Sequence, residues 1–172
     1  RSELHIVEQW LSKLDPHPSV ERKRHEEGKA SRHEATKARS EVSELERRIG
    51  TIGQPIVLIH PGSGGLSKCV PVETLVPLIP VFRSAGWTPA WVIGPDERER
   101  FGEPYERTLA AVAPLIYEES VAAAADVVAE ADAFIGMDAG ITHVAALAGV
   151  NTVALFGPTD PSVWRPLGRS VQ

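Results

Sequence analysis

From residue 54 onward, the sequence alternates short, continuous apolar runs with segments long enough to be helices. The apolar runs are 56–60, 89–93, 114–117, 133–136 and 152–156. Runs of this kind are typical of strands that are buried on both faces of a parallel sheet. The helix-length segments between them are 71–86, 96–112, 119–130 and 141–149. This alternation predicts βα units, and therefore an α/β, Rossmann-like domain whose parallel sheet has helices on both faces.

The predicted sheet also indicates where chemistry should be sought. In sheets of this class, ligands bind at the carboxyl edge of the strands. We therefore examine the loops that follow His60, Ile93, Ile135 and Phe156.

Composition limits the protein class and the cofactors. The 172 residues, of which 42% are hydrophobic and 24% charged, suit one globular domain with an appendage. No apolar run approaches the roughly 20 residues of a membrane-spanning helix. The single Cys69 lies in no metal-ligand spacing, and the net charge of −5 shows no basic footprint for nucleic acid. We expect no metal, no cofactor and no nucleic-acid partner.

Residues 1–53 differ in composition from the rest of the chain. Residues 3–14 carry apolar side chains at helical spacing, and Asp15-Pro16 ends that pattern. Residues 20–48 hold nine Lys/Arg and seven Glu, with a thin apolar seam at helical spacing that includes Leu45 and Ile49. A partner-binding or coiled-coil arm is one interpretation. Because the seam is short and rich in alanine, we favour a solvated helix or insertion, and we divide the chain into 1–53 and 54–172.

The first loop, 61–68, is rich in glycine and ends with Lys68. Its backbone amides and its ammonium group suggest a phosphate contact, although a plain connecting turn is an equal alternative. The loop is not the P-loop of an NTPase. That motif requires glycine at position 67 and Ser or Thr at position 69, where this chain has Ser67 and Cys69.

The loop 136–143 leads directly into an apolar helix. Unpaired amides at a helix N-terminus, together with the helix dipole, favour a diphosphate, and Gly140 permits close approach. Each side chain here has a structural alternative. Asp138 could be the N-cap, Thr142 could satisfy an unpaired amide at the helix start, and His143 could be a core histidine.

Two further loops follow predicted strands. Glu97, after the second strand, could accept hydrogen bonds from ribose hydroxyls, or it could simply begin a charged helix. The proline-rich loop 157–168 is expected to lack regular structure and to form a wall of the pocket.

The loop motifs occur in a fixed order along the chain. They are H-P-G-S-G with Lys68, P-x-E at 71–73, G-P-x-E at 94–97, D-x-G-x-x-H-x-A at 138–145, G-V-x-T-V-A-L-F-G-P-T-D-P at 149–161, and W-x-P-x-G at 164–168. This set resembles the C-terminal domain of glycosyltransferase family 9, the ADP-heptose:lipopolysaccharide heptosyltransferases. The resemblance implies the C-terminal half of a GT-B glycosyltransferase, cut short at its C-terminal end, with 3–14 as the family's inter-domain helix.

The resemblance also implies which residues bind the donor. Phosphate contacts would come from Ser63 or Gly64, from Lys68, from the amides of Gly140, Ile141 and Thr142, and from the side chains of Thr142 and His143. Asp138 would shape the loop, and Glu97 would contact the ribose or the base.

The implied reaction is inverting, metal-independent transfer of a heptose-like sugar from a nucleoside diphosphate, with ADP favoured. The acceptor would be a lipopolysaccharide-type or other glycan, or a lipid-linked one, bound by an N-terminal domain that also carries the general base. The present chain would then bind the donor without catalysing. The expected location is the cytoplasm, including the inner face of its membrane. A non-catalytic sugar-nucleotide-binding or scaffolding module and a GT-B sugar-nucleotide epimerase are the alternatives.

Overall fold

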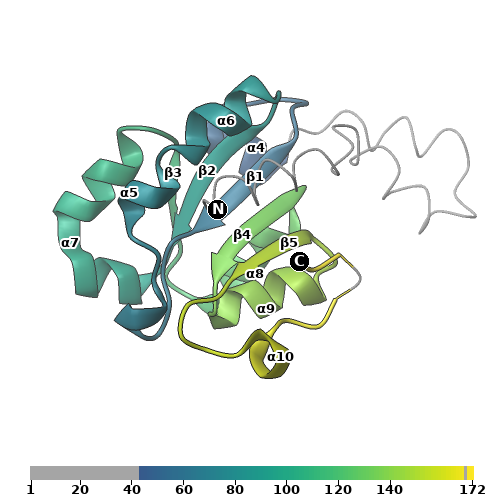
Figure 1. The fold of residues 1–172 in the computed structure, drawn as a ribbon. Helices are drawn as coiled ribbons and strands as arrows, with labels where there is room; N and C mark the ends of the chain where they lie inside the picture. The colour runs from purple at the N-terminus through teal and green to yellow at the C-terminus, as the bar shows by residue number, and fades with distance from the viewer. Residues whose placement is uncertain (1–42, 169) are drawn as a thin grey trace, which may run out of the picture.

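Five parallel strands form the sheet that the apolar runs predict. The computed structural model describes residues 43–168 and 170–172 (Figure 1). The strands are β1 (Ile56–His60), β2 (Thr88–Ile93), β3 (Leu115–Tyr117), β4 (Ala133–Met137) and β5 (Asn151–Leu155). They pair in the order β3-β2-β1-β4-β5, and every pair is parallel. The predicted α/β class and the strand positions are confirmed.

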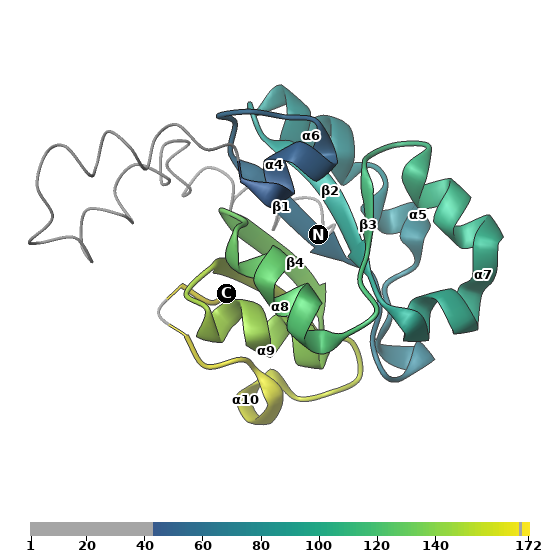
Figure 2. The same cartoon turned by 180° about the vertical axis from the view of Figure 1, so that it is seen from behind.

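Helices cover both faces of the sheet (Figures 1 and 2). Val57 and Ile59 of β1 pack in the core cluster of one face, with residues of the helices α5 (Val72–Leu75), α6 (Leu78–Ser84) and α7 (Pro95–Ala110). Leu58 packs in the cluster of the other face, with α4 (Glu44–Ile49), α8 (Val121–Ala129) and α9 (Gly140–Leu147). Alternate residues of a strand point to opposite faces, so this burial explains the continuous apolar runs. In the part of the chain that the structure describes, no helix is long and apolar enough to cross a membrane.

The segment 71–86 forms two helices rather than the one that we predicted. α5 ends at Leu75, and α6 begins at Leu78 after Pro77. Proline has no N–H to continue the helical hydrogen bonds, so Pro77 interrupts the run. Pro80 is tolerated because it lies in the first turn of α6, where amides lack helical partners.

Helix α4 shows that the end of the charged segment 20–48 is not solvated, contrary to our prediction for that segment. Leu45 and Ile49 are buried in the sheet's second core cluster, and the Leu45 amide donates to Glu130 Oε2 at 2.8 Å. Arg48 forms an ion pair with Glu118. The rest of the charged segment and the predicted helix 3–14 lie outside the described residues. The division at residue 53 stays a prediction, but residues before it contribute to the core.

The loop 157–168 contains regular structure, contrary to our expectation. A short helix, α10 (Pro161–Trp164), begins after Asp160, whose carboxylate accepts from the Ser162 amide at 2.8 Å. Proline at the first helical position is compatible with a helix because its missing N–H has no partner there. Further along, Val171 pairs in parallel with Thr152 at the edge of β5.

We predict that Gly136→Ala destabilises the domain by about 1 to 3 kcal/mol through overpacking. A methyl group at Gly136 would lie 2.3 Å from Thr142 Oγ1 and 2.6 Å from the Phe134 ring. Urea denaturation measures the loss. Gly140→Ala is the control, because its methyl group would meet nothing within 4 Å. Equal stability of Gly136→Ala and the wild type would contradict this account of how α9 packs on β4.

Candidate functional site

The loops at the carboxyl edge of the sheet surround a cavity of about 660 Å³. The strand order reverses direction between β1 and β4, which is the topological switch point where such sheets bind ligands. The walls come from the loop after β1, the loop after β2 with the start of α7, the loop after β3 with the start of α8, and the start of α9. A cavity of this size suits a small-molecule ligand.

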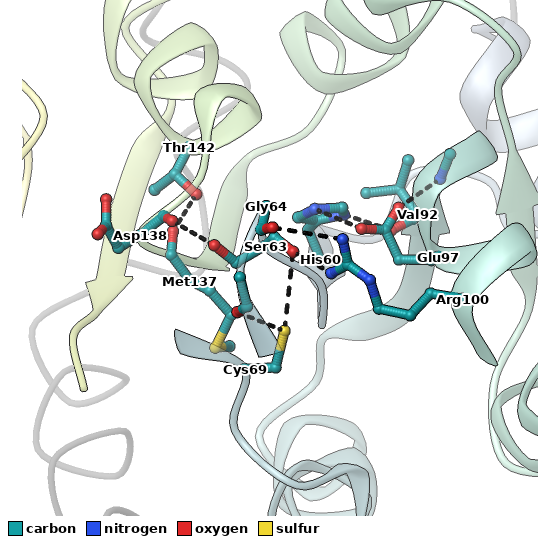
Figure 3. Close-up of polar contacts among 12 residues, drawn as sticks. His60, Ser63, Gly64, Cys69, Val92, Glu97, Arg100, Met137, Asp138 and Thr142 are labelled. Atoms are coloured by element: carbon teal, nitrogen blue, oxygen red, sulfur yellow. Dashed lines mark hydrogen bonds and ion pairs between the residues drawn. The ribbon is translucent and has the colours of Figure 1, made fainter. Parts of the chain in front are cut away.

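The buried carboxylate of Asp138 joins three loops beside this cavity. Its Oδ2 lies 2.8 Å from Lys68 Nζ, in the loop after β1, and accepts at 2.8 Å from Thr159 Oγ1, in the loop after β5. The Asp138 carbonyl also accepts from Ser63 Oγ at 2.6 Å (Figure 3). The loops after β1, β4 and β5 are therefore held together by one residue.

The ionisation of Asp138 reflects this arrangement. Burial opposes the charged form, but hydrogen bonds from Lys68 and Thr159, with the positive charges of Lys68 and His143, outweigh it. The pKa of Asp138 therefore lies below its ordinary value of 3.8. At neutral pH the group is a carboxylate that is paired with an ammonium.

The structure contradicts the interpretation of Asp138 as a helix N-cap. The N-cap of α9 is Ala139, which offers no side-chain hydrogen bond. In the described part of the chain, no acceptor is recorded for the amides of Gly140 and Ile141 in the first turn of α9. Both residues line the cavity, so their N–H groups remain available to a ligand.

Thr142 does not fit the prediction of a phosphate contact. Its side chain is fully buried, and Oγ1 donates to the Met137 carbonyl at 2.7 Å (Figure 3). Its amide donates to the Ala139 carbonyl at 3.1 Å. Thr142 therefore fixes the loop from behind rather than presenting donors to the cavity. His143 is partly buried and close enough to Asp138 to influence its ionisation.

Glu97 lines the cavity and also caps the first turn of α7. It is only 5% exposed, and its Oε2 accepts from the Gly94 amide at 2.9 Å. Its Oε1 lies 3.7 Å from Nε2 of His60, whose Nδ1 is 3.0 Å from the Val92 carbonyl. Glu97 thus closes the first turn of α7 and presents a carboxylate edge beside His60.

The predicted residues divide into two groups in space. Five of them line the cavity: Ser63, Gly64, Glu97, Gly140 and Ile141. The other four do not line it: the ion pair of Lys68 and Asp138, and Thr142 and His143 of α9. The loop 157–168 does not form a wall either, contrary to our expectation, because Thr159 and Gly157 lie against Asp138 and the Ser67-Lys68 turn instead.

Sequence reasoning missed three parts of the site. His60 lines the cavity, the loop after β3 forms a further wall, and Arg100 of α7 donates to the first loop. The rule that selected the other loops also applies to the loop after β3, because β3 ends at the same edge. Arg100 follows Glu97 by three residues, which places both on one helix face. Among residues 43–168 and 170–172, no cluster of three His, Cys, Asp or Glu side chains could hold a metal ion.

Comparison with known protein families shows which family the chain is related to. The model of glycosyltransferase family 9 (heptosyltransferase) matches residues 2–172. The chain belongs to glycosyltransferase family 9. No curated protein matches it significantly.

Solved structures share the fold of this family 9 chain. E. coli ADP-heptose LPS heptosyltransferase II is 22% identical, with a TM-score of 0.62, over 77% of this chain and 43% of that one. E. coli heptosyltransferase WaaC with ADP is 23% identical, with a TM-score of 0.58, over 68% and 36%. The family 9 glycosyl transferase from Veillonella parvula DSM 2008 is 20% identical, with a TM-score of 0.64, over 77% and 40%. The chain spans less than half the length of each, and its fold is that of the GT-B glycosyltransferases.

We predict that Asp138 makes the stability of this family 9 domain depend on acid pH. The pKa of Asp138 in the native state lies below its ordinary value of 3.8, so in acid the unfolded chain binds a proton on this carboxylate more readily than the native state does. The stabilisation by the charged carboxylate is fully present above the ordinary pKa of 3.8, and it is lost as the pH falls through the lowered native pKa. Asp138→Asn should cost about 1 to 3 kcal/mol at neutral pH, and its difference from the wild type should shrink in acid.

Urea denaturation between about pH 3 and pH 7 measures both effects. Asp126→Asn removes a carboxylate from the exposed side of α8 and is the control. A constant difference between Asp138→Asn and the wild type across this range would contradict the ion-pair account.

Proposed function

We propose that this chain is the donor-binding domain of a glycosyltransferase that transfers a sugar from a nucleoside diphosphate. The observation that carries the proposal is the cavity between the first loop and the start of α9, at the switch point of the sheet. Membership of family 9 supports the reaction class. We place the donor-binding domain at residues 54–172 and the inter-domain segment at 1–53.

The phosphate end of the donor would lie at the start of α9. The amides of Gly140 and Ile141 are available there, and Gly64 lines the same cavity from the first loop. Helix N-terminal amides and the helix dipole stabilise anions. Lys68 is about one-third exposed, so its ammonium could donate to a phosphate while it remains paired with Asp138. His143, which lies near Asp138, would donate a hydrogen bond to the same phosphates.

The nucleoside end would lie between the loops after β2 and β3. The Glu97 carboxylate lines this part and could accept hydrogen bonds from ribose hydroxyls. Apolar side chains, including Ile93, Val121 and Ala124, also line it and offer a surface for a flat base. ADP is our favoured nucleotide, since a similar E. coli heptosyltransferase was solved with ADP and with ADP-2-deoxy-2-fluoro heptose.

The proposed reaction inverts the anomeric centre without a metal ion. Lys68 and the amides at the start of α9 would stabilise the charge that develops on the departing diphosphate. The transferred sugar would be heptose-like and the acceptor a lipopolysaccharide-type glycan. The acceptor site and the general base would belong to a separate N-terminal domain, so the present chain would bind the donor in the cytoplasm without turning it over.

We predict that the chain binds ADP in the presence of EDTA and that Lys68→Ala weakens this binding. Loss of a charge-assisted phosphate contact costs about 1.5 to 3 kcal/mol, or roughly 10- to 150-fold in affinity. Isothermal calorimetry with ADP, UDP and GDP measures the affinities and the base preference.

The control for that experiment is Arg107→Ala, which removes an exposed cation that pairs with Glu103 on α7. An unchanged ADP affinity in Lys68→Ala would overturn the assignment of this lysine. Isomerisation or hydrolysis of a UDP-sugar without an acceptor would favour the epimerase. Donor binding by a full-length protein that transfers no sugar would favour the non-catalytic module.

A further inference from the structure

Arg100 donates to two consecutive carbonyls of the first loop. Its Nη1 lies 2.6 Å from the Ser63 carbonyl oxygen, and its Nη2 lies 3.3 Å from the Gly64 carbonyl oxygen (Figure 3). Arg100 projects from α7, one turn beyond Glu97. A planar guanidinium presents its donors in a rigid fork, so it can fix the orientation of two neighbouring peptide groups at once.

The orientation of these carbonyls determines where the next amides point. In a trans peptide, the C=O of one residue and the N–H of the following residue point in opposite directions. Since the carbonyls of Ser63 and Gly64 face Arg100, the N–H groups of Gly64 and Gly65 face away from it. In Figure 3, Arg100 lies on one side of Ser63 and Gly64, and Asp138 and Thr142 lie on the other.

Those two amides, the N–H groups of Gly64 and Gly65, make no hydrogen bond with the described part of the chain. Successive backbone N–H groups that point the same way form a concave site for an anion. Gly64 lines the same cavity as Gly140 and Ile141, so its amide, with that of the neighbouring Gly65, would meet a diphosphate that the start of α9 also binds.

Arg100 is the cation that orients this loop from outside. The two glycines have no side chains, and a Cβ at Gly64 would meet nothing within 4 Å, so packing does not restrict that residue. Ser63 is held on its other side by its hydroxyl, which donates to the Asp138 carbonyl. The Ser63 carbonyl also lies 3.9 Å from Cys69 Sγ, whereas Arg100 is the hydrogen-bond partner that the described residues give the Gly64 carbonyl. Loss of the guanidinium would therefore release the Gly64 carbonyl and loosen the peptide before it.

We propose that Arg100 is a positioning residue that orients the Gly64 and Gly65 amides for the donor's diphosphate. This inference rests on the proposed function. The guanidinium of Arg100 donates to backbone carbonyls and acts on the ligand only through the loop. Its removal should therefore weaken the binding of the diphosphate and leave the binding of the nucleoside unchanged.

Calorimetry of the chain with ADP and with adenosine tests the inference. Arg100→Ala should weaken ADP binding about tenfold or more and leave adenosine binding within about twofold of the wild type. Arg107→Ala, from the same helix, should change neither affinity. Arg100→Gln, which keeps amide donors without the charge, provides a second variant.

The salt dependence of ADP binding separates positioning from direct contact. A cation that donates to a phosphate contributes strongly to the fall of affinity with salt, whereas one that is bound to backbone carbonyls acts on the phosphate only through its screened charge. Arg100→Ala should therefore change the slope of affinity against salt less than Lys68→Ala does. A slope that changes as much as in Lys68→Ala, an unchanged ADP affinity, or an equal loss for adenosine would overturn the inference. A wild-type chain that binds adenosine but no ADP would contradict the proposed function itself.

Discussion

The arrangement of the carboxyl edge depends on one ion pair, between the buried carboxylate of Asp138 and the partly exposed Lys68. An aspartate that is 7% exposed is costly unless it is paired and hydrogen-bonded, and here Lys68 and Thr159 supply both partners. Because these partners come from the loops after β1 and β5, satisfying the charge also fixes those loops relative to the start of α9. The Ser63 hydroxyl adds a second link to the backbone of the same residue. The geometry around the cavity therefore follows from one electrostatic requirement.

The pairing of Asp138 leaves backbone amides free at the cavity. Since Asp138 is engaged with Lys68, it does not cap α9, and the amides of Gly140 and Ile141 remain available at the cavity. Helix α7 contributes two side chains from one face. Glu97 lines the cavity and presents a carboxylate beside His60, and Arg100, outside the cavity lining, holds the carbonyls of the first loop. The cavity is thus lined by free amides and by a carboxylate, which the proposed nucleotide would use at its phosphates and its ribose.

Continuous apolar runs predicted the sheet because its central strands are covered on both faces, and every residue of β1 and of β4 is buried. It did not predict the break at Pro77, where a missing amide outweighs a continuous apolar pattern. The motifs located the cavity residues Gly140 and Glu97. They could not reveal that Thr142 turns inward or that Arg100 reaches the first loop, because both depend on which side-chain partner lies nearby after folding. The burial of Leu45 was equally hidden, since it packs in a core cluster assembled from strands and helices along the whole domain, and the acceptor of its amide, Glu130, lies 85 residues away.

If a diphosphate binds between the first loop and the start of α9 without a metal ion, a crystal structure of the chain with ADP, grown in EDTA, will show it there. We expect phosphate oxygens within hydrogen-bonding distance of the Gly140 and Ile141 amides, and the ribose beside Glu97. ADP bound on another face of the domain, or a diphosphate directed away from α9, would rule out this binding site.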